Sequence, residues 1–282
     1  MSDDASLIDL SAAALAAAAG DQAAARSILD AFQHDVYGLA LRMLGHPTDA
    51  EDAAQEILVI VLTHLGSFRG ESSLKTWVWR IAVNHLSRVR KGRRETISFE
   101  TLDERLRTGL STEALDPGDP EREALASELR LRCTEAMILS LDRELRITYI
   151  LGDVFGLSGE EAAEVLEIEP AAYRKRLSRA RARLHAFLRQ WCGVFDSANP
   201  CRCAGQVQAM VARGLLAAGD LYLSGQQTRP NKVRLHRAAD EVAELMRVAE
   251  VLRGPASYLA PEALVLGLRR LLESQHLELL RD

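Results

Sequence analysis

The sequence predicts an all-α protein with two small helical domains joined by a linker and followed by a helical C-terminal extension. Three observations carry this prediction. Apolar residues recur at helical spacing through alanine-rich segments, aromatic residues make up only 5% of the chain, and no run alternates apolar and polar residues as a half-buried strand does. The 282 residues allow roughly two domains of ~100–200 residues each.

Breaks in the helical periodicity divide the chain into four parts. A stretch with poor periodicity contains Asp-Pro and Pro-Gly pairs, which predict a linker between the two domains. The expected parts are a first domain at 1–94, the linker at 95–122, a second domain at 123–190 and the extension at 191–282. Within the extension, helical segments are expected near 204–223, 232–253 and 261–280.

The apolar runs and the N-terminal residues favour a cytoplasmic protein with no membrane partner. The longest uncharged runs fall far short of the ~20 residues that a membrane span needs. Asp3 and Asp4 stand where a signal peptide would carry cations. In that compartment four cysteines are expected to be thiols or metal ligands rather than structural disulfides.

The charge distribution indicates a polyanionic ligand, although the whole chain carries a net charge of −5. Residues 68–94 hold eight Lys or Arg and one Glu, and residues 173–189 hold seven and no acid. The rest of the chain is therefore strongly acidic. Two basic segments on an acidic body predict nucleic-acid binding together with a separate protein-binding surface.

The acidic element is a helix predicted from Thr48, which we expect to be its N-cap, with Glu51 completing a capping box. Asp49, Asp52 and Glu56 share one face of this helix. The opposite stripe is predicted to be core and consists of Ala50, Ala54, Ile57, Leu58, Val61 and Leu65. The acids are therefore expected to face outward.

A cationic and aromatic helix is predicted directly after the acidic one. Its helically spaced core residues are Leu74, Trp77, Val78, Ile81, His85 and Val89. Trp77, Arg80, Asn84 and Lys91 fall near one edge. A stacking ring beside fixed cations and an amide is the kind of surface that unpaired bases require.

The second domain carries the pattern of a helix-turn-helix. Ser158 and Glu161 have capping-box spacing, a turn follows at Glu167–Glu169, and Pro170 opens the second helix at a position where proline is favoured. The buried stripe of that helix is predicted to be Tyr173, Leu177, Ala180, Leu184 and Leu188. Its remaining face is rich in Arg and Lys, as a helix in the DNA major groove requires. A solvated Arg/Ala helix is the alternative.

The acidic and aromatic elements together resemble the promoter-opening domain of bacterial sigma factors of the extracytoplasmic-function (ECF) subfamily of the sigma-70 family. The second domain resembles the part of those proteins that recognises the −35 promoter element. The likeness covers about residues 25–94 and 130–190. The matching residues in the first domain are Asp49-Ala50-Glu51-Asp52, Gln55-Glu56, Phe68-Arg69-Gly70, Ser73-Leu74 and Thr76-Trp77-Val78-Trp79-Arg80-Ile81-Ala82-Val83-Asn84. In the second domain they are Leu141, Arg146 and the run RKRLSRARARL.

The resemblance implies a non-enzymatic protein that binds core RNA polymerase and directs promoter-specific transcription initiation, for a stress or metal-responsive regulon. The implied docking residues for the coiled coil of the largest polymerase subunit are Asp49, Asp52, Gln55 and Glu56. The implied contacts to −10 promoter DNA are Phe68, Arg69, Trp77, Arg80, Asn84, Arg88, Lys91 and Arg93. The implied contacts to −35 DNA are Tyr173, Arg174, Lys175, Arg176, Ser178, Arg179, Arg181 and Arg183. A separate anti-sigma factor stays open as a further partner.

The sequence departs from the family pattern in two places. The recognition helix opens Pro170-Ala171-Ala172-Tyr173 where most relatives carry Gly-Thr-Val or similar, so a typical −35 preference is not expected. The subfamily usually ends near residue 190, and this chain continues for about 90 residues.

The extension opens with Cys192, Cys201 and Cys203 in C-x8-C-x-C spacing. Two cysteines one residue apart can chelate a soft ion, so zinc or copper(I) is a candidate ligand, with His185 or His236 as the fourth donor. No cofactor is otherwise required. The alternative is a set of buried thiols that pack a helical tail. Cys133 lies on an apolar helix face and is expected to be core.

The sequence motifs also bear on two other function classes. An enzyme is disfavoured because the chain has no HExxH motif, no glycine-rich phosphate loop and no GxSxG motif. A stand-alone helix-turn-helix regulator is the alternative to a sigma factor. Such a regulator would need neither the acidic face nor the aromatic edge.

Overall fold

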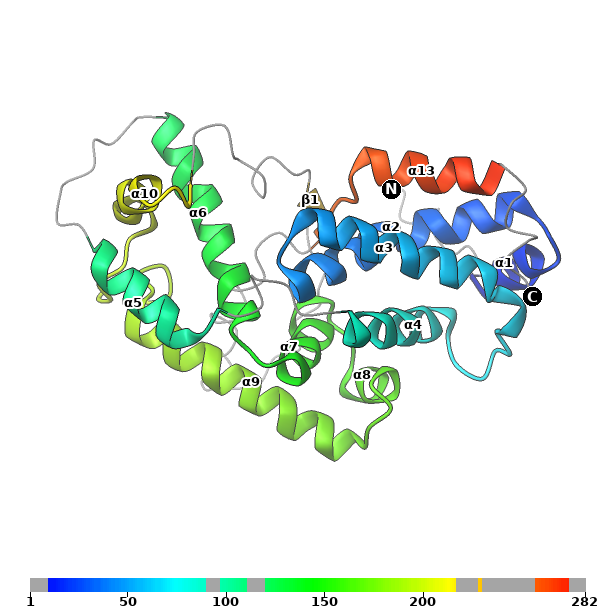
Figure 1. Ribbon diagram of the computed structural model, residues 1–282. Helices are drawn as coiled ribbons and strands as arrows, with labels where there is room; N and C mark the ends of the chain where they lie inside the picture. Colours follow the sequence, from blue (N-terminus) through cyan, green and yellow to red (C-terminus); the bar gives the residue numbers. More distant parts are fainter. Residues whose placement is uncertain (1–9, 90–96, 111–119, 217–227, 230–256, 274–282) are drawn as a thin grey trace, which may run out of the picture.

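The computed structural model describes residues 10–89, 97–110, 120–216, 228–229 and 257–273, in which helices joined by turns and loops make up the fold beside one short strand pair (Figure 1). The predicted all-α class is confirmed. The helices of the first half are α1 (Leu10–Ala18), α2 (Gln22–Leu44), α3 (Pro47–Thr63), the 3₁₀ turn η1 (Leu65–Ser67), α4 (Leu74–Arg88) and α5 (Phe99–Gly109). The others are α6 (Pro120–Leu139), α7 (Arg143–Tyr149), the π-helix η3 (Ile150–Val154), α8 (Gly159–Val165), α9 (Pro170–Trp191), α10 (Cys203–Ala212) and α13 (Glu262–Glu273).

The N-terminal unit packs α1, α3 and α4 around the long helix α2. Asp21 accepts hydrogen bonds from the backbone amides of Ala23 and Ala24 and so caps the start of α2. Gly45 ends it with a left-handed backbone (φ 71°). Every residue of the predicted core stripe of α3 is buried.

The start of α3 differs from the prediction. The helix begins at Pro47 with His46 in the N-cap position, and Thr48 is already helical. Proline is well suited to the first helical position because its φ is fixed and its missing N–H would have no partner there. This preference moves the helix start ahead of the expected Thr48 cap.

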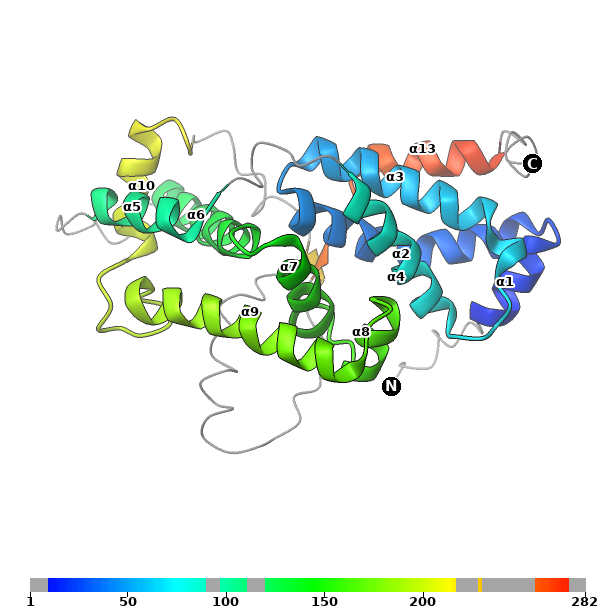
Figure 2. The same cartoon turned by 60° about the horizontal axis from the view of Figure 1, so that its bottom comes forward.

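The second unit consists of α6 to α9 and contains the predicted helix-turn-helix. Ser158 and Glu161 form the expected capping box. Glu167 adopts a left-handed backbone (φ 53°) in the turn, and α9 starts at Pro170 as predicted. Figure 2 shows α8 and the start of α9 on the side of the unit that meets α4.

The expected linker contains a docked helix, α5, which sequence periodicity missed. Ser98 caps it by accepting from the amide of Thr101. The ring of Phe99 lies 5.5 Å from that of Phe187 on α9, and the indole of Trp191 donates to Asp103 at 2.7 Å. An 11-residue helix with two buried residues gives too short a pattern to be distinguished from a loop by sequence alone.

The C-terminal extension contacts both units. Helix α10 packs on α6, and α13 packs on α2 and α3. Strands β1 (Thr228–Arg229) and β2 (Ser257–Tyr258) pair antiparallel and are the exception to the helical fold in the described ranges. The helix expected near 232–253 lies outside the described residues. Among the helices placed by the structure, none has the length and apolar character that crossing a bilayer requires.

Candidate polymerase and promoter interface

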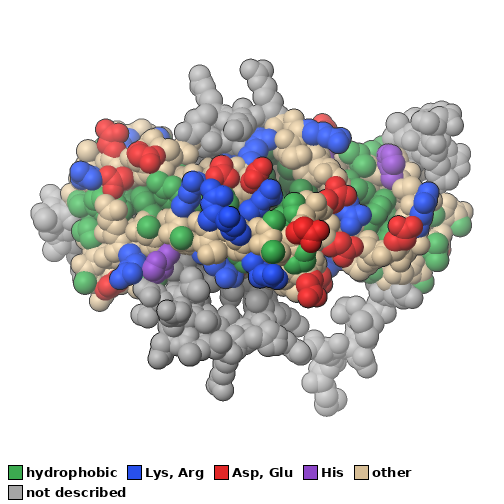
Figure 3. All heavy atoms as spheres, turned by 90° about the horizontal axis from the view of Figure 1, so that it is seen from below, with side chains coloured by type: hydrophobic (Ala, Val, Ile, Leu, Met, Phe, Trp, Pro, Cys, Tyr) green, Lys and Arg blue, Asp and Glu red, His purple; other side chains and the backbone are tan. Residues whose placement is uncertain are grey.

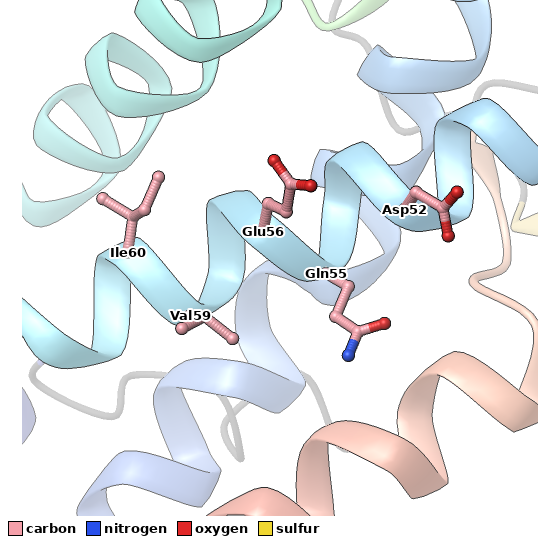
Figure 4. A pocket seen from close by; sticks show the side chains of 5 residues that line it. All are labelled: Asp52, Gln55, Glu56, Val59 and Ile60. Atoms are coloured by element: carbon pink, nitrogen blue, oxygen red, sulfur yellow. The ribbon is translucent and has the colours of Figure 1, made fainter. Parts of the chain in front are cut away.

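The acidic face of α3, which we define as Asp49, Asp52, Gln55 and Glu56, is exposed at all four positions. Behind it, Ala50, Ala54 and Ile57 are fully buried, so the helix presents one face outward and fixes the other in the core. Part of the acidic face borders a shallow depression. Its lining residues are Asp52, Gln55, Glu56, Val59 and Ile60 (Figure 4).

Electrostatic contacts tie this face to its neighbours. The Glu56 carboxylate lies 3.3 Å from Nε2 of His85 on α4. Partial burial raises the pKa of Glu51, and the adjacent Asp52 charge raises it further. A dense group of carboxylates that repel one another would be relieved by a cationic partner.

The predicted −10 surface of α4 is assembled around Trp77. Its ring is half-buried and lies 5.7 Å from the ring of Phe68. Asn84, Arg88 and Arg69 are exposed. Phe68, also predicted to contact −10 DNA, is only 8% exposed, so in this structure its ring packs against Trp77.

Two of the predicted −10 cations, Lys91 and Arg93, lie outside the described residues. The remaining predicted cation of α4, Arg80, contacts the first helix of the helix-turn-helix. Its guanidinium lies 3.5 Å from Glu164 and 3.6 Å from Glu167.

The contact between α4 and the second unit was not predicted from the sequence. Trp79 is 1% exposed and its ring lies 4.6 Å from that of Phe155. Arg143 donates to the carbonyls of Leu86, Ser87 and Val89 at the end of α4. Helix α4, which carries the predicted −10 contacts, is therefore packed against the domain expected to bind −35 DNA.

A second unpredicted link is the buried Arg146 on α7. It donates to Met43 O at the end of α2 (2.5 Å), to Leu139 O (2.7 Å) and to Leu141 O (2.9 Å). Its side chain is 2% exposed. The sequence signalled Arg146 only as part of the family resemblance, and its structural role is to close the end of α6 and hold α7 against α2.

The basic face of α9 is only partly free for DNA. Arg174, Lys175, Ser178 and Arg179 are exposed. Figure 3 shows Lys and Arg side chains gathered on the face of the molecule along which α9 runs. The other cations of the predicted −35 set have carboxylate partners inside the second unit. The pairs are Arg176–Glu144 (3.4 Å), Arg181–Asp153 (2.6 Å) and Arg183–Asp142 (3.1 Å).

Two members of the predicted −35 set have structural roles. Tyr173 is 1% exposed, and burial raises the pKa of its phenol, so in this structure it is a core residue, as its place in the predicted buried stripe requires. Arg181 binds both oxygens of the largely buried Asp153, and this hydrogen bonding raises the pKa of its guanidinium. Arg181 therefore fixes α9 on η3.

The cysteines of the extension come together at the end of α9. Cys192 and Cys201 form an isolated backbone bridge, and the side-chain amide of Asn199 closes the intervening loop by donating to the Cys192 carbonyl. Burial raises the pKa of Cys201 to about 12, with smaller contributions from Cys203 and Cys192.

The fourth cysteine, Cys133, lies on α6. Cys133 packs against the core as predicted, and burial raises the pKa of its thiol, with smaller contributions from the three tail cysteines. All four cysteines are free thiols. Within the described residues, no three His, Cys, Asp or Glu side chains are arranged as a metal-binding group. Of the two expected fourth donors, His185 lies edge-on to Phe195 at 5.6 Å and His236 lies outside the described residues.

Comparison with known proteins matches both units separately. Residues 28–95 match the family model Sigma-70 region 2, and residues 131–184 match Sigma-70, region 4. RNA polymerase sigma-H factor of Pseudomonas aeruginosa is 33% identical over 166 residues, which cover 57% of this chain and 84% of that protein. The ECF RNA polymerase sigma-E factor of Escherichia coli K12 is 34% identical over 166 residues, covering 57% and 85%.

A solved structure, that of CnrH in complex with the cytosolic domain of CnrY, is similar over 64% of this chain and 96% of that chain, at 24% identity and a TM-score of 0.45. The matches of the two family models leave the extension uncovered.

The two matched regions occur in the order and at the positions that the motifs predicted. A stand-alone helix-turn-helix regulator would not account for the match to region 2. The relatives are initiation factors and not enzymes. The chain belongs to the ECF subfamily of the sigma-70 family, and it binds core RNA polymerase and directs promoter-specific transcription initiation.

Proposed function

We propose that the three exposed surfaces divide the work of initiation. The acidic face of α3 docks on the coiled coil of the largest polymerase subunit. Trp77 and Asn84 on α4 hold an unstacked base of the non-template −10 strand, and the exposed cations of α9 bind the −35 duplex. The observation that supports this division most directly is that each surface lies on a separate helix whose opposite stripe is buried.

The packed arrangement of the two units must open before a promoter is bound. The −10 and −35 elements are centred about 25 base pairs apart, which is about 85 Å at ~3.4 Å per pair. Arg80 on α4 contacts Glu164 on α8 at 3.5 Å, and the 22 residues of α9 span only about 33 Å at ~1.5 Å per residue. The two DNA-binding surfaces therefore engage together only after regions 2 and 4 separate.

Strand opening and duplex binding should be separable by mutation. Asn84→Ala should impair opening of the −10 strand, because it removes an amide from the base-binding edge. Arg179→Ala should weaken binding to the −35 duplex by ~1–3 kcal/mol if it contacts a base edge. Run-off transcription with core enzyme, on a closed promoter and on one carrying a pre-melted −10 bubble, measures both effects.

The bubble should restore transcription by the Asn84→Ala protein and not by the Arg179→Ala protein. Ala182→Ser on the exposed side of α9 is the matched control and should behave as wild type on both templates. Equal rescue of the Asn84 and Arg179 variants would remove the assigned division between α4 and α9.

The cysteine-bearing extension is proposed to be regulatory and to bind zinc or copper(I) through Cys192, Cys201 and Cys203. The backbone bridge that places Cys192 beside Cys201, with Cys203 two residues further on, supports this proposal, and all three are free thiols. Bringing them into one coordination sphere requires movement of the loop, and ligation would couple that movement to α10. A separate anti-sigma factor, a metal-responsive regulon and a cytoplasmic location stay predictions.

The metal proposal predicts one equivalent of bound metal in reduced protein and proton release on binding, because thiols deprotonate when they ligate a metal. Metal analysis of wild type and of a Cys201→Ser/Cys203→Ser variant measures this directly. Promoter-specific transcription by both proteins should then be compared across added zinc and copper(I). Sub-stoichiometric metal in the wild type, together with identical transcription by the two proteins, would assign the thiols to packing.

A further inference from the structure

Helix α13 of the extension is docked on region 2 by an apolar stripe. Leu264, Leu268 and Leu272 lie four residues apart and are 6%, 0% and 4% exposed. They pack into the core formed by α2 and α3. Figures 1 and 2 both show α13 running alongside these helices. The opposite side of α13 is solvated, and Leu266 there is 43% exposed.

Two ion pairs fix α13 along α2. Arg269 lies 3.0 Å from Asp30, and Glu273 lies 3.0 Å from Arg26. Because the charges alternate on both helices, the pairs favour this orientation of α13 over the reversed one. An apolar stripe with flanking complementary charges is the pattern of a helix held in a groove.

The residues before α13 enter between regions 2 and 4. Tyr258 is 1% exposed, and its hydroxyl donates to the carboxylate of Glu135 on α6 at 2.6 Å. The guanidinium of Arg42 on α2 lies over the Tyr258 ring, 4.7 Å from its centroid. The backbone amide of Ala260 donates to Nδ1 of His34 on α2. Tyr258 thus contacts the long helix of region 2 and the first helix of the second unit at the same time.

The docked helix borders the acidic face. Figure 4 shows the α13 ribbon on the side of α3 toward which the Gln55 side chain points. Asp52, Gln55 and Glu56 line the depression on α3, with Gln55 pointing toward α13 and Glu56 away from it (Figure 4). A coiled coil that approached this face would meet α13 at its edge.

We propose that residues 257–273 form an intramolecular clamp, in which Tyr258 holds α2 to α6 and α13 covers the flank of the polymerase-docking face. This inference rests on the proposed docking role of α3. Core polymerase and α13 then compete for region 2, and the affinity for polymerase is reduced by the fraction of molecules in which the clamp is closed. Release of the clamp also frees the two units to separate.

The clamp predicts that undocking α13 tightens polymerase binding. Leu268→Asp places a charge in the fully buried position of the stripe and should lower the dissociation constant for core enzyme by roughly tenfold, within the usual ~5–150-fold range of coupling between sites. Leu266→Asp makes the same chemical change on the exposed side of the same helix and should leave the constant unchanged. Fluorescence titration of the full-length proteins with core polymerase measures both.

A charge exchange tests the docked geometry. Arg269→Glu should tighten polymerase binding by a few-fold because it repels Asp30, and adding Asp30→Arg should return the constant toward wild type. Hydrogen exchange in residues 262–273 reports docking without polymerase and should rise in Leu268→Asp while exchange in α9 stays unchanged. In the wild type, exchange in this segment should rise when core polymerase is added.

The proposal is overturned if Leu268→Asp releases α13 by hydrogen exchange but binds polymerase with unchanged or weaker affinity. It is also overturned if polymerase leaves exchange in wild-type α13 unchanged. If the polymerase does not dock on the acidic face of α3, the result differs, because the Asp52→Lys protein would then bind polymerase as wild type does. Displacement of α13 by polymerase is measured independently of that variant.

Discussion

Asp52→Lys is expected to remove most of the affinity for core polymerase while leaving the protein folded. Asp52 is exposed on the acidic face, and the adjacent Ala53 and Ala54 keep the core stripe intact. Placing a cation opposite a cationic partner turns attraction into repulsion, which costs several kcal/mol at an interface. Since about 1.4 kcal/mol is a tenfold change, we expect a rise of ~100-fold or more in the dissociation constant.

Glu104→Lys is the matched control for the Asp52 variant. It makes the same change of charge at an exposed position of α5, away from α3, and should bind core polymerase as wild type does. Titration with core enzyme measures binding, and circular dichroism confirms that both variants are folded. Wild-type affinity in a folded Asp52→Lys protein would show that the polymerase docks elsewhere.

Arg146→Met is expected to lower the free energy of unfolding by about 3–5 kcal/mol, because it leaves three backbone carbonyls without their buried charged donor. Arg146 is 2% exposed and donates to three backbone carbonyls, and methionine keeps its volume without the donors. Each buried carbonyl left without a partner costs about 1–3 kcal/mol. Urea denaturation followed by circular dichroism measures the loss.

Arg143→Met is the matched control for Arg146→Met, because Arg143 also donates to three carbonyls but is partly exposed. Water can replace its hydrogen bonds, so the expected loss is about 1 kcal/mol. Equal losses in the two variants would mean that burial does not set the strength of these contacts.

The elements that sequence analysis predicted well are specified by local signals. The Ser158–Glu161 capping box and Pro170 act within a few residues, so the helix-turn-helix was located with its boundaries. The core stripe of α3 follows from helical periodicity alone. The same helical periodicity also placed Asp49, Asp52 and Glu56 on one exposed face, whereas Gln55 was added from the family resemblance.

The parts that were missed depend on contacts between distant segments. Helix α5 is held by Phe187 and Trp191, more than 80 residues away. Tyr173 was placed both in the core stripe and among the DNA contacts, and only the fold distinguishes the two. The pairing of Arg80 with Glu164 could not be predicted, because nothing in the sequence indicates which carboxylate of a distant helix a given cation will meet.

The pairing of Arg80 also bears on how the free protein behaves among genomic DNA. Glu164 and Glu167 present carboxylates to a guanidinium that would otherwise attract any phosphate. A phosphate contact made by Arg80 must therefore replace an existing ion pair, so it releases fewer counterions and gains less free energy than a contact to an unoccupied cation. Under the proposed separation of regions 2 and 4, these carboxylates would weaken binding of the packed protein to random duplex, and the separated form would recover that affinity at the promoter.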